Sequence, residues 1–445
     1  MDALKSSRLS VADLFPVRSG VRPVEMGPMY VGWNILPRVG EACQAAGLAG
    51  RAVVGMDVNT QKAAGDAVVS CLQAAGYAVR SILIGPADGS RFLSNSNLSR
   101  WMLSQCDPLP DFFVSVGAGT LTDIVKYAAY LVEKPFAAVA TAASVDAYTS
   151  NIAAMVDGEV KKSLPCRAPA MVLADMDVIA GAPPDLTLAG YGDTLAKFTS
   201  CGDWVMAHEL WGEAYQREVA VATFQSAREL LDRAEAVRAR EPKAMELLMR
   251  GQLALGIAMW LADSSRPASG AEHLVSHCWD MLAVREHTLP AYHGYQVAVG
   301  TMQMARLYEI FDREHVWRDG VEPVREAFAR LGRERQTALA RLGADPAEVG
   351  KNWESEAALS HFRQSVSLVW PQLRDKIGEF LVPVYELEGA YRRAGCPVEA
   401  AAVGIDPATA ERTFLDARYL RSRFTILDLF DAFRPLSSAV AEVVR

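Results

Sequence analysis

Short apolar runs alternate with amphipathic, helix-like stretches through the first 184 residues of this 445-residue chain. The apolar runs have the length of buried strands and cover residues 51–57, 78–85, 111–119, 136–142 and 170–177. Stretches with helical spacing lie between several of them, at 60–76, 96–105 and 121–134. Strands that alternate with helices predict a parallel sheet, and strands without polar alternation predict one covered on both faces. We therefore expect an α/β domain over residues 1–184.

The texture of the sequence changes after Pro184. Long stretches rich in Ala, Leu, Glu and Arg follow, and helical apolar spacing is clear at 217–241 and 322–343. Proline residues punctuate these stretches, as they do between helices. We expect an all-helical domain over residues 185–445.

Bulk composition limits the partners and the compartment. The net charge is −8 and the isoelectric point is near 5.5, which argues against nucleic acid or an anionic membrane as the main partner. The seven cysteines are scattered and form no CxxC pair, as expected for reduced thiols in a cytoplasmic enzyme. The first residues lack a signal-peptide pattern, and no apolar run reaches the roughly 18–20 residues that span a bilayer. We expect a soluble, cytoplasmic protein.

Three of the seven histidines fall in two neighbouring motifs. His273 and His277 are four residues apart and share one face if their segment is helical. His293 precedes a glycine at an expected loop–helix junction, and upstream Asp193 follows another glycine. Two imidazoles, one carboxylate and an open position are the usual composition of a catalytic divalent-metal site. A single histidine of this kind is more often a core or surface residue, but three together with Asp193 favour a metal.

A glycine-rich turn follows the apolar run at 111–119. It contains Gly117, Gly119, Thr120 and Asp123 and opens the next helical stretch. A strand-to-helix turn of this kind presents backbone N–H groups and a positive helix end to an anion such as a pyrophosphate. Thr122 stands where the Rossmann fingerprint has its third glycine, so a simple tight turn is the alternative.

Polar residues also follow two other expected strands. Asp57 and Asn59 lie at the end of the first, where a carboxylate could bind a ribose hydroxyl or cap the next helix. Thr141, Ser144 and Asp146 follow the fourth, where a ligand site and an ordinary capped turn both fit. Ligands of parallel sheets bind at the carboxyl ends of strands, which favours the functional interpretation.

Five segments together resemble the motifs of a known family. They are GAGTLTDIVKY, TAASVDAYTSNIAAM, GYGDTLAKFTSCGDW, SRPASGAEHLVSHCWDM and HGYQVAVGT. In this order they resemble sn-glycerol-1-phosphate dehydrogenase, particularly its bacterial AraM-type branch. That family is grouped with glycerol dehydrogenase, iron-type alcohol dehydrogenases and dehydroquinate synthase. The resemblance covers nearly the whole chain. It implies a Rossmann-like N-terminal domain with a parallel sheet, an all-α C-terminal domain, a dehydroquinate synthase-like fold and a homodimer.

The resemblance also assigns a metal and a substrate site. It implies one divalent metal, Zn, Ni or Fe, held by Asp193, His273 and His293. His277 would then lie beside the metal, near the substrate, and Asp146 would contact substrate hydroxyls.

The same resemblance implies NAD(P)(H) as the cofactor. The pyrophosphate would lie on the turn from Gly117 to Asp123, which includes Gly119 and Thr120. Thr141 and Ser144 would lie near the phosphates and ribose, and Asp57 and Asn59 would face the adenosine ribose.

The implied reaction is reversible hydride transfer between NAD(P)H and dihydroxyacetone phosphate, giving sn-glycerol 1-phosphate. Lys197 and Arg266 are the cationic candidates for the substrate phosphate, and a surface position is the alternative for Lys197. The sequence departs from the family pattern at Ala140 and Ala147, which replace Pro and Gly, and at Gln296, which replaces Lys. These changes leave open another phosphorylated or polyhydroxylated ketone or aldehyde, including an NAD-retaining cyclase or lyase reaction. A catalytically silent binding subunit is a further alternative, against which the intact metal triad argues.

Overall fold

The computed structural model describes residues 3–15, 26–158, 160–318, 322–343 and 353–444. Packing divides the chain into two compact units. The first contains Met1–Thr194, Asp232–Ser264 and Ala283–Leu289, and the second contains Leu195–Leu231, Ser265–Leu282 and Pro290–Arg445. The single boundary predicted at residue 184 stays a prediction. Beyond it, segments of the first unit alternate along the chain with segments of the second.

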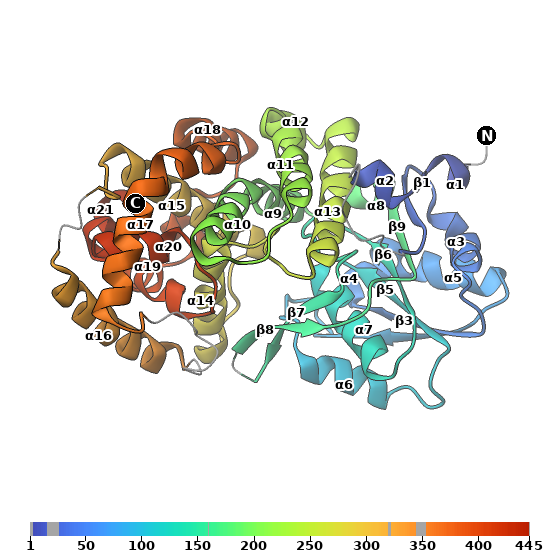
Figure 1. Cartoon of the computed structure of the whole chain (residues 1–445). Helices are drawn as coiled ribbons and strands as arrows, with labels where there is room; N and C mark the ends of the chain where they lie inside the picture. The colour runs from blue at the N-terminus through green and yellow to red at the C-terminus, as the bar shows by residue number, and fades with distance from the viewer. Residues whose placement is uncertain (1–2, 16–25, 159, 319–321, 344–352, 445) are drawn as a thin grey trace. The chain divides into compact units, whose positions relative to one another are not determined.

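The first unit is built on a seven-stranded sheet among the described residues, with the order β1-β2-β9-β6-β5-β3-β4. Figure 1 labels five of these strands, β1, β9, β6, β5 and β3. Its strands are β1 (Arg8–Leu9), β2 (Met29–Gly32), β3 (Arg51–Met56), β4 (Ala78–Leu83), β5 (Phe112–Gly117), β6 (Phe136–Ala140) and β9 (Met171–Asp175). Every neighbouring pair is parallel except β1 with β2. The five strands predicted from apolar runs are β3, β4, β5, β6 and β9. All residues of β5, β6 and β9 are buried, as expected for a sheet covered on both faces.

Helices of the first unit pack against this sheet or against one another. They include α3 (Val39–Ala45), α5 (Asp66–Ala74), α6 (Ser96–Ser104), α7 (Gly119–Leu131), α8 (Met176–Ala180), α12 (Ala234–Arg238) and α13 (Pro242–Ala262). The stretch predicted at 60–76 is one helical run in three parts: α4 (Val58–Thr60), a π-helical segment at Gln61–Gly65, and α5. Val54, Val68, Leu72 and Phe112 belong to the apolar cluster formed by strands and helices.

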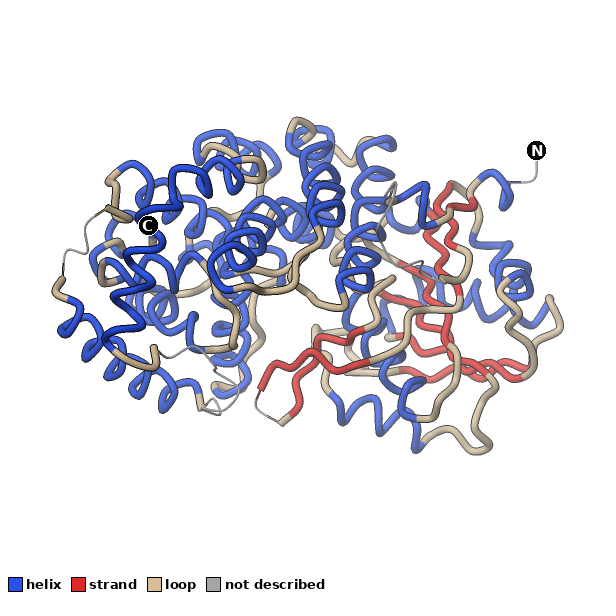
Figure 2. The backbone as a smooth tube through the Cα atoms, viewed as in Figure 1, coloured by secondary structure: helices blue, strands red, loops and turns tan. Residues whose placement is uncertain are grey.

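A two-stranded antiparallel hairpin, β7 (Ile152–Asp157) and β8 (Val160–Pro165), stands apart from the sheet (Figure 2). The apolar runs do not predict it, because β8 carries polar residues at three of its six positions, Lys161, Lys162 and Ser163. The short strands β1 and β2 are likewise absent from the predicted set. Only the longer buried strands therefore have a clear signal in the sequence.

The second unit is helical throughout its described residues, as the sequence predicts. Its main helices are α10 (Lys197–Trp211), α11 (Arg217–Leu231), α14 (Ala271–Arg285), α15 (His293–Arg313), α16 (Val324–Leu342), α17 (Glu356–Gly378), α18 (Val384–Ala394), α19 (Pro407–Asp416) and α20 (Ile426–Phe433). Large buried aromatic side chains, among them Trp204, Trp279 and Trp370, fill its core. Of the helices in the described part of the chain, none has the length and apolar character needed to cross a membrane.

Candidate metal centre and active site

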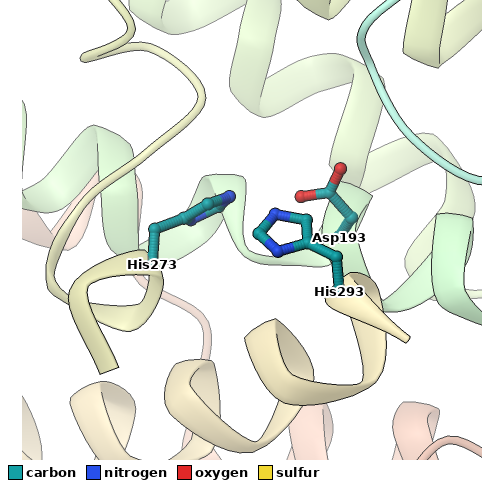
Figure 3. A group of neighbouring side chains, drawn as sticks. All are labelled: Asp193, His273 and His293. Atoms are coloured by element: carbon teal, nitrogen blue, oxygen red, sulfur yellow. The ribbon is translucent and has the colours of Figure 1, made fainter. Parts of the chain in front are cut away.

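Three side chains predicted as metal ligands converge in the structure. Asp193 lies near the end of α9 (Pro184–Leu195), His273 in the first turn of α14, and His293 at the first position of α15. One potential ligand atom from each lies within 4.8 Å of the other two. Figure 3 shows the three side chains pointing toward one another. Two imidazole nitrogens and one carboxylate oxygen suit a divalent ion such as zinc, and leave positions open for substrate.

A close helix crossing brings the two histidines together. Gly300 lies two turns after His293 on α15, and a Cβ at this position would stand 2.6 Å from the backbone oxygen of Glu272. Only glycine leaves room for such an approach. The crossing places α14 and α15 so near that the ring centroids of His273 and His293 are 5.2 Å apart.

The carboxylate of Glu272 holds the ring of His273. Glu272 Oε1 lies 2.8 Å from His273 Nδ1 and also accepts a hydrogen bond from the Gly270 amide at 2.6 Å. Its other oxygen accepts a hydrogen bond from Thr199 Oγ1 at 2.9 Å. An Nδ1–H that donates to a carboxylate leaves Nε2 as the metal-binding nitrogen, the arrangement common around protein-bound zinc.

Glu272 stays ionised in a fully buried place. Burial alone would raise its pKa, but the hydrogen bonds from His273 and from the Gly270 amide hold that pKa below its usual value. A second buried carboxylate, Asp203, accepts hydrogen bonds from Tyr308 Oη (2.6 Å), the Ala271 amide (2.8 Å) and the Ile426 amide (2.9 Å). Burial and the nearby Glu272 raise the pKa of Asp203 to about 7.

A polar chain also supports His293. Ser276 Oγ lies 3.2 Å from His293 Nδ1. The buried amide of Gln296 fits best with its nitrogen toward α14, where it donates to Ser276 Oγ (2.7 Å) and Asp280 Oδ1 (3.1 Å). The Ser276 hydroxyl can then accept from both His293 Nδ1–H and Gln296, which leaves Nε2 of His293 for a metal. Gln296 therefore contacts Ser276, the residue whose hydroxyl orients the candidate ligand His293.

The other residues expected near the substrate lie in different elements and differ in burial. The His277 ring is 6.2 Å from His273 and 6.1 Å from His293, between centroids, and His277 is outside the group of potential ligands. Lys197 is fully buried at the start of α10. Asp146 is partly buried in the loop after β6. Arg266 is buried and forms an ion pair with Glu213.

The glycine-rich turn joins β5 to α7 as predicted. Ala118 precedes the 13-residue helix α7, and no side chain caps its first N–H groups. Gly119 is tightly packed, since a Cβ there would lie 2.5 Å from the Val145 side chain in the loop after β6. Thr120 is partly exposed in the first turn. This uncapped helix end fits the pyrophosphate of a dinucleotide.

Asp123, in the first half of α7, forms a buried ion pair with Lys126. Its carboxylate receives a hydrogen bond from Lys126 Nζ (3.3 Å) and one from the Ala154 amide (3.2 Å). The buried Lys126 ammonium also donates to Ala147 O, Ser150 Oγ and Ile152 O at 2.7–3.1 Å. Lys126 thus fixes the loop that follows Asp146, and Asp123 supplies its counter-charge.

The expected ribose-contacting residues lie at strand ends. Asp57 Oδ1 caps the next helix by accepting from the Asn59 amide (2.9 Å) and the Thr60 amide (2.7 Å). Asn59 is exposed and donates from Nδ2 to Gly89 O. Thr141 and Ser144 are buried in the loop after β6, and the Thr141 amide donates to Gly117 O across the turn.

Comparison with known proteins shows the family to which the chain belongs. Residues 30–183 match the family model for iron-containing alcohol dehydrogenases. The chain is 31% identical over 384 residues to a glycerol-1-phosphate dehydrogenase [NAD(P)+] of Geobacillus thermodenitrificans, covering 85% of each chain. The chain belongs to the glycerol-1-phosphate dehydrogenase family. A relative with the same name from Methanothermobacter thermautotrophicus is 33% identical over 72% of this chain and 85% of its own.

The fold is also similar to that of solved dehydrogenase structures. Crystalline glycerol dehydrogenase from Schizosaccharomyces pombe superposes with a TM-score of 0.61 at 17% identity, covering 95% of this chain and 92% of that one. The expected dehydroquinate synthase-like fold is confirmed. So is the family resemblance found in the motifs.

The three departures from the family motifs have separate structural settings. Ala140 ends β6 and pairs with Gly117 of the cofactor turn. The carbonyl of Ala147 accepts from Lys126, and Gln296 lies in the polar chain behind His293.

Proposed function

We propose that this member of the family catalyses the reversible reduction of dihydroxyacetone phosphate to sn-glycerol 1-phosphate with NADH or NADPH. The single observation that carries the proposal is the convergence of Asp193, His273 and His293 within 4.8 Å. The names of the relatives supply the substrate class. A silent binding subunit would have no need of this donor set.

The donor set fits a divalent metal, and the uncapped turn fits a dinucleotide. A metal bound by the three ligands would supply a Lewis acid for the carbonyl group of the substrate. Asp193, His273 and His293 hold it, while Glu272 and Ser276 orient the two imidazoles. Gly117, Gly119 and Thr120, with Thr141 and Ser144 nearby, receive the cofactor phosphates, and Asp57 and Asn59 its adenosine ribose.

Other residues bind the substrate and move protons. Asp146, in the loop fixed by Lys126, orients a substrate hydroxyl. His277, beside both ligand histidines, belongs to the path that carries a proton to the new hydroxyl. Lys197 contributes positive charge from the start of α10. We further propose a homodimer in the cytoplasm; the support is the family resemblance and seven cysteines, all described and none in a disulfide.

An absorbance assay at the nicotinamide band tests the proposal. Metal-loaded protein should oxidise NADH or NADPH when dihydroxyacetone phosphate is added. A chelator, Asp193→Ala and His273→Ala should each abolish this oxidation while nucleotide binding persists. Nucleotide binding without oxidation would reject the proposed substrate. Tight retention of NAD⁺ without net turnover, during conversion of another sugar phosphate, would instead identify a cyclase or lyase.

A further inference from the structure

A loop at residues 265–270 leads directly into α14, the helix that carries His273. Arg423, in the segment before α20, holds this loop at both ends. Its guanidinium donates from Nη1 to the backbone oxygen of Ser269 at 2.5 Å and from Nη2 to the Ser265 hydroxyl. Ser269 lies four residues before His273. Arg423 is thus tied to the base of the metal-binding helix.

A second arginine in the same loop has a different partner. Arg266 forms three contacts with the Glu213 carboxylate: Nε donates to Oε2 at 2.7 Å, and Nη2 lies 2.5 Å from both Oε1 and Oε2. It also donates to the backbone oxygen of Phe424, whose amide donates to Glu213. The charge of Arg266 is therefore neutralised, and the pair fixes the backbone next to Arg423. This argues against Arg266 as the phosphate-binding cation expected from the sequence.

Arg423 lacks such a partner. Its guanidinium forms no ion pair with a carboxylate of the described residues, and both of its hydrogen bonds go to uncharged oxygens. A guanidinium has five N–H groups, so three remain after these two bonds. Burial and the neighbouring guanidiniums of Arg266 and Arg421 lower the pKa of Arg423 to about 9. An anion beside Arg423 would relieve both effects.

Two other possible anion-binding groups nearby are already occupied. The backbone amides of Gly270 and Ala271, at the start of α14, donate to the carboxylates of Glu272 and Asp203. An anion arriving at this end of α14 therefore finds the Arg423 guanidinium rather than the helix terminus. A planar guanidinium matches the oxygens of a phosphate group.

We propose that Arg423 binds the phosphate group of the substrate, and so selects a phosphorylated ketone over its unphosphorylated counterpart. This inference rests on the proposed function and adds a specificity residue to it. Arg266 and Glu213 act through the backbone at Phe424 as positioning residues. The ligand class is a short-chain phosphomonoester whose carbonyl lies at the metal ligands.

Substrate discrimination in Arg423 variants tests the proposal. In Arg423→Met, the KM for dihydroxyacetone phosphate should rise on the order of 10- to 100-fold, the loss expected for hydrogen bonds to a charged group. The kcat/KM for unphosphorylated dihydroxyacetone should fall much less, because only the phosphorylated ketone loses a contact with its phosphate. Arg423→Lys, which keeps one charged donor, should fall between the wild type and Arg423→Met. Arg412→Met, on the exposed face of α19, removes a cation elsewhere and should change neither substrate.

Direct binding of inorganic phosphate separates this inference from the proposed reaction. Calorimetry should detect phosphate binding to the wild type and to Arg412→Met, and lose it in Arg423→Met. That result supports the site even if the wild type fails to reduce dihydroxyacetone phosphate, an outcome that rejects only the reaction. Equal losses with both ketones, or phosphate binding unchanged in a folded Arg423→Met, overturn the proposal. Thermal unfolding of each variant checks its fold.

Discussion

Glu272 Oε1 lies 2.8 Å from Nδ1 of His273, and both residues are buried in the first turn of α14. The carboxylate selects the tautomer in which Nε2 is free of hydrogen, and it fixes the plane of the ring. Glu272, which precedes the candidate ligand His273 in sequence, therefore also orients its ring. Such outer contacts commonly change metal affinity by 10- to 100-fold.

Replacement of Glu272 should weaken metal binding with little change in the ligands themselves. Glu272→Gln keeps the shape of the side chain but removes its charge, so His273 becomes a poorer ligand. We expect metal affinity to fall about 10- to 100-fold. Titration against a chromophoric chelator measures this. Glu326→Gln, exposed on α16, is the matched control. An unchanged affinity in Glu272→Gln would mean that His273 needs no carboxylate.

Asp203 should make stability depend on pH in the acid-to-neutral range. Its folded-state pKa of about 7 is above the ordinary value of 3.8, so its contribution is greatest below pH 4 and declines as the pH rises to about 7. The unfolding free energy of the wild type, relative to Asp203→Asn, should therefore fall by a few kcal/mol across this interval. The Asp203→Asn change also weakens the acceptor for the Ala271 amide, which lowers stability by a constant amount at every pH.

Urea unfolding of both proteins at several pH values between 4 and 8 measures that difference. Parallel curves for the wild type and Asp203→Asn would contradict the raised pKa. Asp375→Asn, which replaces an exposed carboxylate of α17, should give a curve parallel to the wild type above pH 5.

The sequence predicts the buried strands because apolar runs such as those of β5 and β6 are a local signal. The histidine motifs and Asp193 indicate a metal site, and the family resemblance names Asp193, His273 and His293 as its ligands, the group that the structure brings together. The supporting residues have no such signal. Glu272 adjoins a predicted ligand, yet only the fold shows that its carboxylate turns back to His273. Arg423 is 150 residues from His273 in sequence, and only packing brings its segment to the base of α14. The sequence likewise does not predict that α13 belongs to the first unit, because the pattern of an apolar helix does not show which part of the chain it packs against.

Lys126 should be essential for the stability of the first unit. Its side chain is fully buried, and Lys126→Met removes the counter-charge of the Asp123 carboxylate and one hydrogen bond from each of three further oxygens. Removal of one partner of a buried ion pair typically costs about 3–5 kcal/mol. Chemical unfolding should show a loss of this size, and the KM for the substrate should rise because the loop after Asp146 loosens.

A double variant distinguishes the ion pair from simple packing. Asp123→Asn with Lys126→Met removes the uncompensated carboxylate, so it should be more stable than Lys126→Met alone. Lys134→Met, at a partly exposed site just after α7, should change stability by less than about 0.5 kcal/mol. A double variant that is less stable than Lys126→Met would refute the charge-based explanation.

The crossing of α14 and α15 at Gly300 should tolerate no side chain. In Gly300→Ala, the new Cβ would meet the Glu272 carbonyl at 2.6 Å, so the helices must separate. Overpacking of this kind costs about 1–3 kcal/mol, more than the roughly 0.5–1 kcal/mol that alanine gains over glycine in a helix. Metal affinity should fall as well, because His273 and His293 move apart with their helices. Gly332→Ala is the control: it lies within α16, its Cβ would have nothing within 4 Å, and it should raise stability by about 0.5–1 kcal/mol. Chemical unfolding and chelator competition measure stability and metal affinity in both variants. If Gly300→Ala and Gly332→Ala gained equal stability and metal affinity did not change, α14 and α15 would have space for a side chain at their crossing.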